Sequence, residues 1–343
     1  MNLLFRAEAS VVIGTGHVMR CLALAQAWQD AGGRASFAMA QVTPAVEERL
    51  RRESIGVVRL KAEPGSADDA KDTAALAREK QASWAVVDGY GFGADYQVAL
   101  KSAGLKVLFV DDNGHAAHYS ADLVLNQNAH ANEALYRNRE FSTSMLLGPR
   151  YALLRREFSA QRGWKREIPA IARNVLVTMG GSDPDNFTRE AVGGVRAVKD
   201  ESLRIRVLAG GSNPHFASLE ELSMEKGSSI ELVRDATDMP DQMRWADVAV
   251  AAAGSTCLEM CFMGLPALLI DLAENQTPIA NEFVRRGTAH HLGSLRTVTA
   301  DQIEAETRQL LVSQVERSTM SQRGQELVDG KGAERVVREL LVS

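Results

Sequence analysis

The chain has 343 residues, of which 45% are hydrophobic and 24% are charged. These values are ordinary for a protein that buries a full core, and the length predicts two domains or three. Lys and Arg number 39 against 44 Asp and Glu, so the formal net charge is −5. Because a nucleic-acid-binding protein normally has a basic face, this weak acidity argues against such a partner.

The sequence also indicates where the protein works. No apolar run approaches the ~18 to 20 residues of a membrane span, and the first residues lack the basic region and long apolar segment of a signal peptide. Of the three cysteines, Cys257 and Cys261 are one helical turn apart. An odd count with this spacing argues against a disulfide framework. We therefore expect a cytoplasmic protein without membrane insertion.

Strand-like and helix-like segments alternate along most of the chain. In the first half the predicted strands are Leu3–Arg6, Arg34–Ala38, Val57–Leu60, Trp84–Asp88, Val107–Asp111 and Leu123–Leu125. The predicted helices between them are His17–Ala31, Pro44–Arg52, Ala67–Lys80 and Ala94–Ala103. The strand segments are short, β-branched and without polar alternation, which is typical of parallel strands buried on both faces.

The second half repeats this scheme after Gln161–Pro169, a polar segment with Gly and Pro that is typical of a domain boundary. The predicted strands are Val175–Met179, Ile205–Ala209, Ile230–Val233, Val248–Ala251 and Ala267–Asp271, with helices such as Asp185–Val198 and Cys257–Met263 between them. From Asp301 to Ser343 the pattern is helical, with a break at residues 329–332. We therefore predict two doubly wound α/β domains, whose ligands bind beyond the carboxyl ends of the strands.

The first connection from strand to helix contains Gly14, Gly16 and His17. The glycines allow the backbone to approach a ligand closely, and the helix that begins near His17 points its free N–H groups at the same place. The helix dipole favours the neutral form of His17, which suits a proton acceptor. The alternative is a tight turn with a solvent-facing His17. Arg20, one turn later, either meets a phosphate or pairs with Glu8.

A second cluster follows a strand that ends in small residues. Gly254, Ser255 and Thr256 form a turn at a predicted helix start, which is suited to hold a diphosphate. Glu259 lies one turn further and is placed to accept hydrogen bonds from two ribose hydroxyls. The alternative is structural, because Thr256-x-x-Glu259 also matches a capping box. The spacing does not decide between the two.

The segment Met-Gly-Gly-Ser-Asp-Pro starts the second domain. Gly180, Gly181 and Ser182 are candidates for a phosphate contact in this segment. The structural alternative is that Asp183 caps the next helix and Pro184 occupies its first turn. Both interpretations fit the residues.

Weaker candidates follow other strands. Asp88, Tyr90 and residues 111–113 lie at strand ends, where α/β sites are built, but turn and N-cap chemistry explains them equally. His115 and His118 have metal-ligand spacing without a third ligand nearby in the sequence. No metal site is predicted.

Motifs along nearly the whole chain match one known family. They are Phe5–Ser10, Ile13–Leu22, Val110–Asp112, Asp122–Asn128, Gly148–Phe158, Thr178–Asp183, Ala253–Glu259, Glu274–Gln276 and Asp329–Ala333. The chain resembles in these motifs the nucleotide-sugar hydrolase family of the pseudaminic acid pathway (PseG). The Gly-x-Gly-His-x-x-Arg opening is specific to this group. The family usually has Asp where this chain has Glu8, so the carboxylate here reaches one methylene further.

The resemblance implies a fold and an activity. The family has the glycosyltransferase B (GT-B) fold and is similar to the lipid-linked N-acetylglucosaminyltransferase of peptidoglycan synthesis. Two Rossmann-like doubly wound domains facing a cleft are implied, here residues 1–163 and 170–318, with UDP held mainly by the second and helices within 319–343 crossing back to the first. The implied reaction releases UDP from a UDP-linked 2,4-diacetamido-2,4,6-trideoxy-altrose, without metal or cofactor, for a flagellin or surface glycan.

The matching motifs also imply roles for single residues. His17 is the expected catalytic base. The expected UDP-binding residues are Gly14, Gly16, Gly180, Gly181, Ser182, Gly254, Ser255, Thr256 and Glu259. The expected sugar-binding residues are Arg6, Glu8, Tyr90, Asn275 and Gln276. With a diphosphate cradle and no metal ligands, we expect water to attack the anomeric carbon with inversion.

Two other functions stay open on the residues alone. A UDP-sugar-dependent glycosyltransferase of the same fold would need an acceptor site, and the polar segment Lys61–Lys80 offers no membrane-facing patch for a lipid acceptor. A catalytically silent nucleotide-sugar sensor would need no base, so the presence of His17 argues against it. The predicted partner is a small UDP-sugar, and a monomer is favoured.

Overall fold

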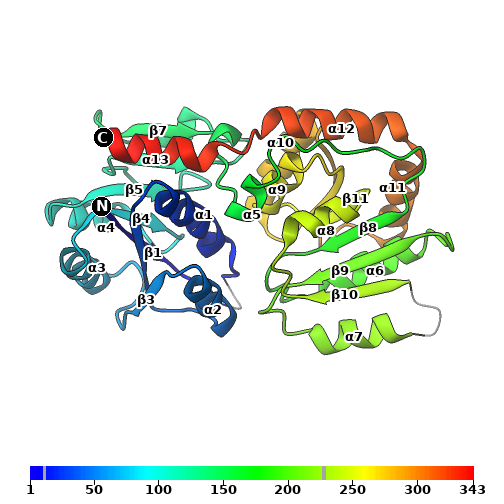
Figure 1. Cartoon of the computed structure of the whole chain (residues 1–343), viewed down its shortest axis with the longest axis horizontal. Helices are drawn as coiled ribbons and strands as arrows, with labels where there is room; N and C mark the ends of the chain where they lie inside the picture. The colour runs from blue at the N-terminus through cyan, green and yellow to red at the C-terminus, as the bar shows by residue number, and fades with distance from the viewer. Residues whose placement is uncertain (11–12, 226–228) are drawn as a thin grey trace. The chain divides into compact units, whose positions relative to one another are not determined.

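The structure, a computed structural model, describes residues 1–10, 13–225 and 229–343. The chain divides into two compact units (Figure 1). Unit 1 comprises Met1–Arg156 together with Gly330–Ser343, and unit 2 comprises Glu157–Asp329. Within these described ranges, no helix is both long and apolar enough to cross a lipid bilayer.

Unit 1 is built on a parallel sheet that has seven strands among the described residues. They are β1 (Asn2–Ala7), β2 (Arg34–Met39), β3 (Gly56–Arg59), β4 (Ala82–Asp88), β5 (Lys106–Val110), β6 (Leu123–Asn126) and β7 (Ser144–Leu147), in the order β3-β2-β1-β4-β5-β6-β7. Its helices are α1 (Gly16–Asp30), α2 (Pro44–Arg52), α3 (Ala67–Glu79), α4 (Ala94–Ser102), η1 (Glu133–Tyr136), η2 (Pro149–Tyr151) and α13 (Gly332–Val342), and the short α5 (Arg156–Ser159) leads into unit 2.

Both faces of this sheet are buried. Successive side chains of a strand point to opposite faces, so Leu3 and Phe5 of β1 pack with α1, α2 and α13, whereas Leu4 packs with α3 and α4. All three side chains are fully buried. Burial on both faces explains why the strands of unit 1 are continuous apolar runs rather than alternating ones.

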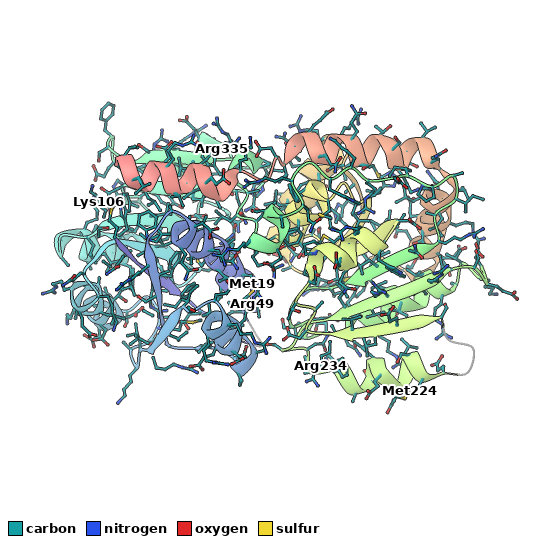
Figure 2. The ribbon with its side chains drawn as sticks, in the orientation of Figure 1. Met19, Arg49, Lys106, Met224, Arg234 and Arg335 are labelled. Carbon is teal, nitrogen blue, oxygen red and sulfur yellow. The ribbon has the colours of Figure 1, made fainter. Side chains whose placement is uncertain are left out.

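Helix α13, drawn in red in Figure 1, completes one of these faces. Leu340 is buried in the same cluster as α1, and its carbonyl oxygen accepts a hydrogen bond from Nε1 of Trp84 at 3.1 Å. Lys106 and Arg335, both labelled in Figure 2, donate to backbone carbonyl oxygens of this unit. The last helix is therefore part of the core of unit 1.

Unit 2 has a parallel sheet of six strands, again counted over described residues. They are β8 (Asn174–Thr178), β9 (Arg204–Ala209), β10 (Ile230–Arg234), β11 (Val248–Ala252), β12 (Ala267–Asp271) and β13 (Ala289–Ser294), in the order β10-β9-β8-β11-β12-β13. Its helices are α6 (Phe187–Arg196), α7 (Phe216–Met224), α8 (Met239–Trp245), α9 (Thr256–Phe262), η3 (Glu274–Gln276), α10 (Thr277–Arg285), α11 (Ala300–Val312) and α12 (Gln314–Leu327).

Strand order reverses once in each sheet, and this decides where a site is built. In unit 1 the chain moves outward from β1 through β2 to β3, then returns to pair β4 with β1 on the other side. In unit 2 the same reversal separates β8 from β11. At such a point the connections after the two strands run in opposite directions, which leaves a crevice at their carboxyl ends.

These two doubly wound sheets confirm the predicted fold class, and each predicted strand overlaps an observed one. The sequence pattern did not indicate β7 or β13. Strand β13 contains His290, His291 and Gly293, so it lacks the apolar run by which a buried strand is found. Strand β7 has only four residues at the sheet edge.

The observed boundaries between the units differ from the domain boundaries that were predicted at residues 163 and 319. Helix α12 lies wholly in unit 2, because Met320 is buried in its core and Gly324 packs against the backbone of Cys261. The return to unit 1 starts at Gly330. A Cβ atom at Gly332 would lie 2.3 Å from the carbonyl oxygen of Ala152, so only glycine lets α13 begin this close to the backbone.

Candidate functional site

The connection after β1 holds His17 at the start of a helix. Gly14 has φ +79°, and its N–H donates to the carbonyl oxygen of Ser10 at 2.8 Å. Helix α1 begins at Gly16, so His17 lies in its first turn. His17 is buried, so the alternative of a solvent-facing histidine is wrong.

The ring of His17 is held by a carboxylate from the neighbouring strand. Its Nδ1 atom lies 2.6 Å from Oδ1 of Asp88, the last residue of β4. Burial alone would raise the pKa of Asp88, but Arg20 and His17 outweigh burial and hold it below its usual range. Nη2 of Arg20 also lies near Nδ1, at 3.1 Å, but the Asp88 oxygen is closer. Because an ionised carboxylate only accepts hydrogen bonds, this closer contact assigns the proton to Nδ1. The lone pair of the neutral ring is then on Nε2, which can accept a proton.

Arg20 binds two buried aspartates and not Glu8, so one of the two alternatives for Arg20, the pair with Glu8, is wrong. Its Nε and Nη2 atoms donate to Asp88 at 2.6 and 2.7 Å, and its Nη1 and Nη2 atoms donate to Asp112 at 2.6 and 3.0 Å. The pKa of Asp112 is lowered, because the attraction of Arg20 outweighs burial. Both edges of the guanidinium are thereby occupied.

Tyr90 lies beside His17 on the loop after β4. The two rings meet edge to face with centroids 5.1 Å apart, and the Tyr90 hydroxyl donates to Oδ2 of Asp112 at 3.0 Å. Burial of the hydroxyl and the charge of Asp112 raise the pKa of Tyr90 above its usual range. Tyr90 is 48% exposed, so part of its ring is open to a ligand.

Arg6 and Glu8 occupy a different position from the one expected of sugar-binding residues. Arg6 is fully buried, and its Nε donates to Oδ1 of Asp69 at 2.9 Å while Nη1 pairs with Glu8. The Glu8 carboxylate also accepts hydrogen bonds from the backbone N–H groups of Ala40 and Gln41. These side chains bind each other and the loop after β2, while Nη2 of Arg6 is buried without a hydrogen-bond partner.

In unit 2, Gly180, Gly181 and Ser182 form the connection after β8. Gly180 has φ +86°, which favours glycine, and a Cβ atom at Gly210 would lie 2.2 Å from the carbonyl oxygen of Gly181. Glycines 180 and 210 therefore fix the path of this loop at the point where the strand order reverses. This is the position that the phosphate hypothesis requires.

The helix after this loop starts later than predicted. Helix α6 begins at Phe187, so Pro184 precedes it and does not occupy its first turn. The carboxylate of Asp183 still accepts hydrogen bonds from the backbone N–H groups of Phe187 and Thr188, each at 2.9 Å. It caps the helix from outside, through a left-handed turn at residue 186.

The connection after β11 contains Gly254, Ser255 and Thr256. The N-cap of α9 is Ser255, whose side chain makes no capping hydrogen bond, and Thr256 is already the first helical residue. The capping box that the spacing suggested needs Thr256 as N-cap, so it is not formed. Glu259 lies in the first turn and is partly buried.

Asn275 and Gln276 lie in η3, directly after β12. The Gln276 side-chain oxygen accepts a hydrogen bond from the N–H of Leu272 at 2.9 Å. A Cβ atom at Gly254 would lie 4.0 Å from Nε2 of Gln276. The fold of unit 2 thus brings the 274–276 segment to the Gly254 loop, at the carboxyl edge of the sheet.

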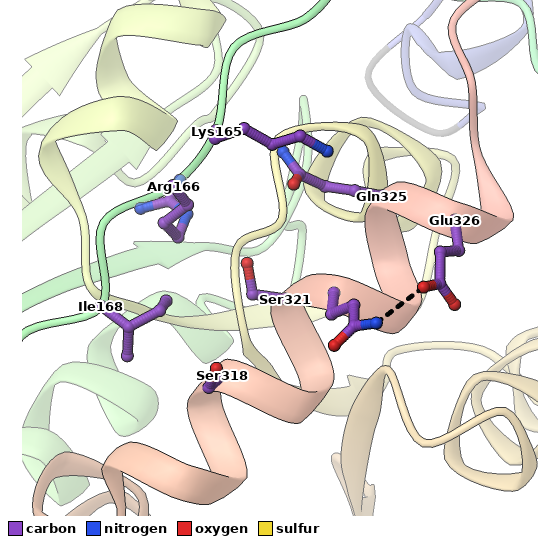
Figure 3. A pocket seen from close by; sticks show the side chains of 8 residues that line it. Lys165, Arg166, Ile168, Ser318, Ser321, Gln325 and Glu326 are labelled. Carbon is purple, nitrogen blue, oxygen red and sulfur yellow. Dashed lines mark hydrogen bonds between the residues drawn. The ribbon is translucent and has the colours of Figure 1, made fainter.

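None of these residues lines the cavity of unit 2 that Figure 3 shows. It is polar and is lined by Lys165, Arg166, Ile168, Ser318, Ser321, Gln322, Gln325 and Glu326. The Arg166 guanidinium that borders it donates to the carbonyl oxygens of Met243, Ala246 and Met263. Elsewhere among the described residues, no group of three or more His, Cys, Asp or Glu is arranged to hold a metal ion.

Asp88 and Asp112 are the residues that the sequence analysis did not assign to the site. Each follows a buried apolar strand, Val86-Val87 before Asp88 and Phe109-Val110 before Asp111-Asp112. An aspartate directly after a buried strand is a sequence signal for a site residue, but the same pattern is also typical of a turn. The pairing of each aspartate with Arg20, which no sequence spacing shows, is what distinguishes them.

Comparisons with known proteins agree with this architecture. The model of the Glycosyltransferase family 28 C-terminal domain matches residues 174–335. The spore coat polysaccharide biosynthesis protein SpsG of Bacillus subtilis is 30% identical over 237 residues, which cover 67% of each chain. The UDP-2,4-diacetamido-2,4,6-trideoxy-beta-L-altropyranose hydrolase of Campylobacter jejuni is 25% identical over 289 residues, or 84% of this chain and 97% of that one.

Solved structures give the same fold. MurG of Acinetobacter baumannii superposes with a TM-score of 0.64 at 16% sequence identity, covering 100% of this chain and 99% of that one. Together with the two parallel doubly wound sheets, this similarity shows the two-domain GT-B fold.

Proposed function

Since the chain belongs to the family of the spore coat polysaccharide biosynthesis protein SpsG and has the GT-B fold, we propose that it is a UDP-sugar hydrolase. Its proposed substrate is a UDP-linked 2,4-diacetamido-2,4,6-trideoxyhexose of the altrose type, an intermediate of pseudaminic acid synthesis. The observation that carries this proposal is the hydrogen bond between His17 and Asp88, which leaves Nε2 of His17 as a proton acceptor.

His17 is the proposed general base. Its Nε2 takes a proton from a water molecule while the water oxygen bonds to the anomeric carbon of the sugar. The bond from that carbon to the diphosphate oxygen breaks, and UDP leaves with the electron pair. Attack opposite the leaving group inverts the configuration at the anomeric carbon. Asp88 supports this step because it fixes the tautomer and stabilises the imidazolium that forms.

Residues of unit 2 are proposed to bind UDP. Gly180, Gly181 and Ser182 follow β8, while Gly254, Ser255 and Thr256 follow β11, the two strands between which the order reverses. Backbone N–H groups in such loops bind phosphate oxygens and stabilise the charge on a departing diphosphate. Glu259 is proposed to accept hydrogen bonds from the ribose hydroxyls. In unit 1, the Gly14 and Gly16 backbone is proposed to contact the same nucleotide.

The sugar is proposed to contact Tyr90, Asn275 and Gln276. Tyr90 has an accessible ring beside His17, and the Gln276 amide lies beside the Gly254 loop. Asn275 precedes Gln276 in η3. Arg6 and Glu8 are proposed to act indirectly. The Glu8 carboxylate accepts hydrogen bonds from the N–H groups of residues 40 and 41. The length of the Glu8 side chain therefore determines the position of the loop after β2, and Glu8 itself does not contact the sugar.

A glycosyltransferase is the second candidate. The matching C-terminal domain is that of a glycosyltransferase family, and the same base could take a proton from an acceptor hydroxyl instead of water. The two functions differ in one requirement, since a transferase needs an acceptor to release UDP at a useful rate.

The test is to incubate the protein with the proposed UDP-sugar and with UDP-N-acetylglucosamine, each without an acceptor, and to measure UDP. The hydrolase proposal expects multiple turnovers with the trideoxyhexose substrate and far less with the other nucleotide sugar. UDP release that appears only after an acceptor is added would identify a transferase. His17→Asn is the control for a contaminating hydrolase.

A further inference from the structure

A group of four buried side chains connects three elements of unit 1. His17 and Arg20 come from α1, Asp88 ends β4, and Asp112 follows β5. Each of the four is less than a tenth exposed. Arg20 joins them, since one edge of its guanidinium binds Asp88 and the other binds Asp112 through two hydrogen bonds each. Bidentate bonds of this kind fix the orientation of both carboxylates.

Three neutral side chains also contact this group. Asn128 Nδ2 donates to Asp112 at 2.6 Å, the Tyr90 hydroxyl donates to the same carboxylate, and Cys21 Sγ lies 3.4 Å from Asp88. Burial raises the pKa of both Cys21 and Tyr90, so both groups are neutral near pH 7.

Two further ionisable side chains lie near Asp112. His130 Nε2 is 3.1 Å from the carbonyl oxygen of Asp112, and His115 forms a pair with Asp111. Asp111 Oδ2 lies 3.2 Å from Nδ1 of His115, and the Asp111 carboxylate also accepts hydrogen bonds from Tyr119 and from two backbone N–H groups. Burial lowers the pKa of His115, but Asp111, the carbonyl oxygen of Phe92 and the charge of Asp112 together raise it. The pair of Asp111 with His115 adds no net charge when His115 is protonated.

The charge of the buried group follows by addition. Two carboxylates and one guanidinium give a net charge of −1 when His17 is neutral, and a proton on His17 brings the sum to zero. A buried net charge is costly, because little solvent screens it. The group is therefore arranged so that protonating His17 removes a charge instead of creating one.

We infer that Arg20 and Asp112 are positioning residues for His17: Arg20 clamps Asp88 in the orientation that holds the imidazole, and Asp112 supplies the negative charge that a proton on His17 cancels. Neither residue touches the reacting atoms. This inference rests on the proposed role of His17 as the base. Arg20 cannot be replaced by lysine in this role, because an ammonium group cannot present two planar edges to two carboxylates.

The first test uses the folded wild-type protein and needs no substrate. Nitrogen-15 NMR of labelled histidine reports which ring nitrogen carries the proton. Above its titration midpoint, His17 is expected in the tautomer with the proton on Nδ1, and His17→Asn identifies its signals. A His17 found with its proton on Nε2 would overturn the inference, whatever the activity of the protein.

The second test measures the titration midpoint of His17 in Asp112→Asn. This nearly isosteric change removes the extra negative charge, so the midpoint should fall by about one pH unit. The acid limb of kcat/KM for UDP release should fall with it, while the Kd for UDP stays the same. Asp68→Asn, an exposed residue of α3, makes the same change in net charge and should leave the midpoint in place. An unmoved midpoint in Asp112→Asn would refute the role of Asp112.

The third test is Arg20→Lys, which keeps the charge and removes the clamp. The kcat for UDP release should fall at least tenfold at unchanged UDP affinity, whereas a purely structural residue would lower only the unfolding temperature. Wild-type kcat in this variant would overturn the role of Arg20. If the wild type releases no UDP from any UDP-sugar, the proposed function fails. The tautomer of His17 and its titration midpoints in the variants still test the roles of Arg20 and Asp112 in that case.

Discussion

Nδ1 of His17 and Oδ1 of Asp88 lie 2.6 Å apart, although 71 residues separate them in the chain. The distance is short because β1 and β4 are neighbours in the sheet, with Ala7 paired to Asp88 at their carboxyl ends. The chain leaves the two strands in opposite directions there. The helix that follows β1 thus returns His17 to the end of β4.

Replacing His17 with Asn should lower kcat for UDP release by about 10²- to 10⁴-fold, the usual contribution of a general base. Affinity for UDP should not change, because the nucleotide is proposed to bind residues of unit 2. Steady-state kinetics and calorimetry with UDP check this. His118→Asn is the matched control, since His118 is a partly exposed histidine of the same unit. A His17 variant that keeps more than about half of wild-type kcat would refute the assignment.

Asp88→Asn should reverse the tautomer of His17. The new amide donates a hydrogen bond to Nδ1, so the proton moves to Nε2 and the ring can no longer accept one there. We expect kcat to fall by about 10²-fold or more with a small change in KM. Asp95→Asn, in the first turn of α4 and exposed, should behave as the wild type. Equal kcat in the two variants would show that Asp88 is only structural.

Glu259→Ala distinguishes a ribose ligand from a structural residue. Loss of a charged hydrogen-bond acceptor should weaken UDP binding by more than ~1 kcal/mol. A helix-capping role would instead cost about 0.5 to 2 kcal/mol of stability and leave UDP affinity intact. Calorimetry with UDP, run beside thermal unfolding, separates the outcomes, and Glu220→Ala on the exposed face of α7 is the control. An unchanged Kd would exclude the ribose role.

Arg6→Met should destabilise unit 1 rather than impair sugar binding. The change leaves Glu8 and Asp69 as buried carboxylates without their cation, which costs about 3 to 5 kcal/mol when one partner of a buried ion pair is removed. Urea unfolding followed by tryptophan fluorescence measures this loss. Arg78→Met, at an exposed position of α3, should change stability by less than about 0.5 kcal/mol. Wild-type stability with a raised KM for the sugar nucleotide would restore Arg6 as a ligand.

Hydrolysis is expected to break the bond between the anomeric carbon and the diphosphate oxygen. If water attacks the anomeric carbon, hydrolysis in ¹⁸O-labelled water places the label in the free sugar and none in UDP. The sugar must be sampled before its anomeric oxygen exchanges with solvent. We also expect full activity in a chelator, since attack at phosphorus is the route that most needs a metal to neutralise the phosphoryl oxygens. Label in UDP, or activity that returns only with a divalent ion, would contradict this mechanism.

Much of this architecture follows from the sequence. The strands of both units are short apolar runs because parallel strands are buried on both faces, and this local property is visible without a structure. Glycines 14 and 180 likewise mark the turns after β1 and β8, because glycine readily adopts the positive φ that both have. Strand β13 was not predicted, because two of its residues are histidines that pair with carboxylates and so interrupt the apolar pattern of a buried strand.

The partners of charged side chains were decided only by the tertiary structure. Arg6, Glu8 and Arg20 lie within fifteen residues of each other, and Arg20 was expected to meet Glu8 or a phosphate. The order of the strands instead brings Asp69 and the loop after β2 to Arg6 and Glu8, and Asp88 and Asp112 to Arg20. A guanidinium binds whichever carboxylates the fold places around it. Sequence distance cannot predict that choice, because the sheet brings together strand ends that lie far apart in the chain.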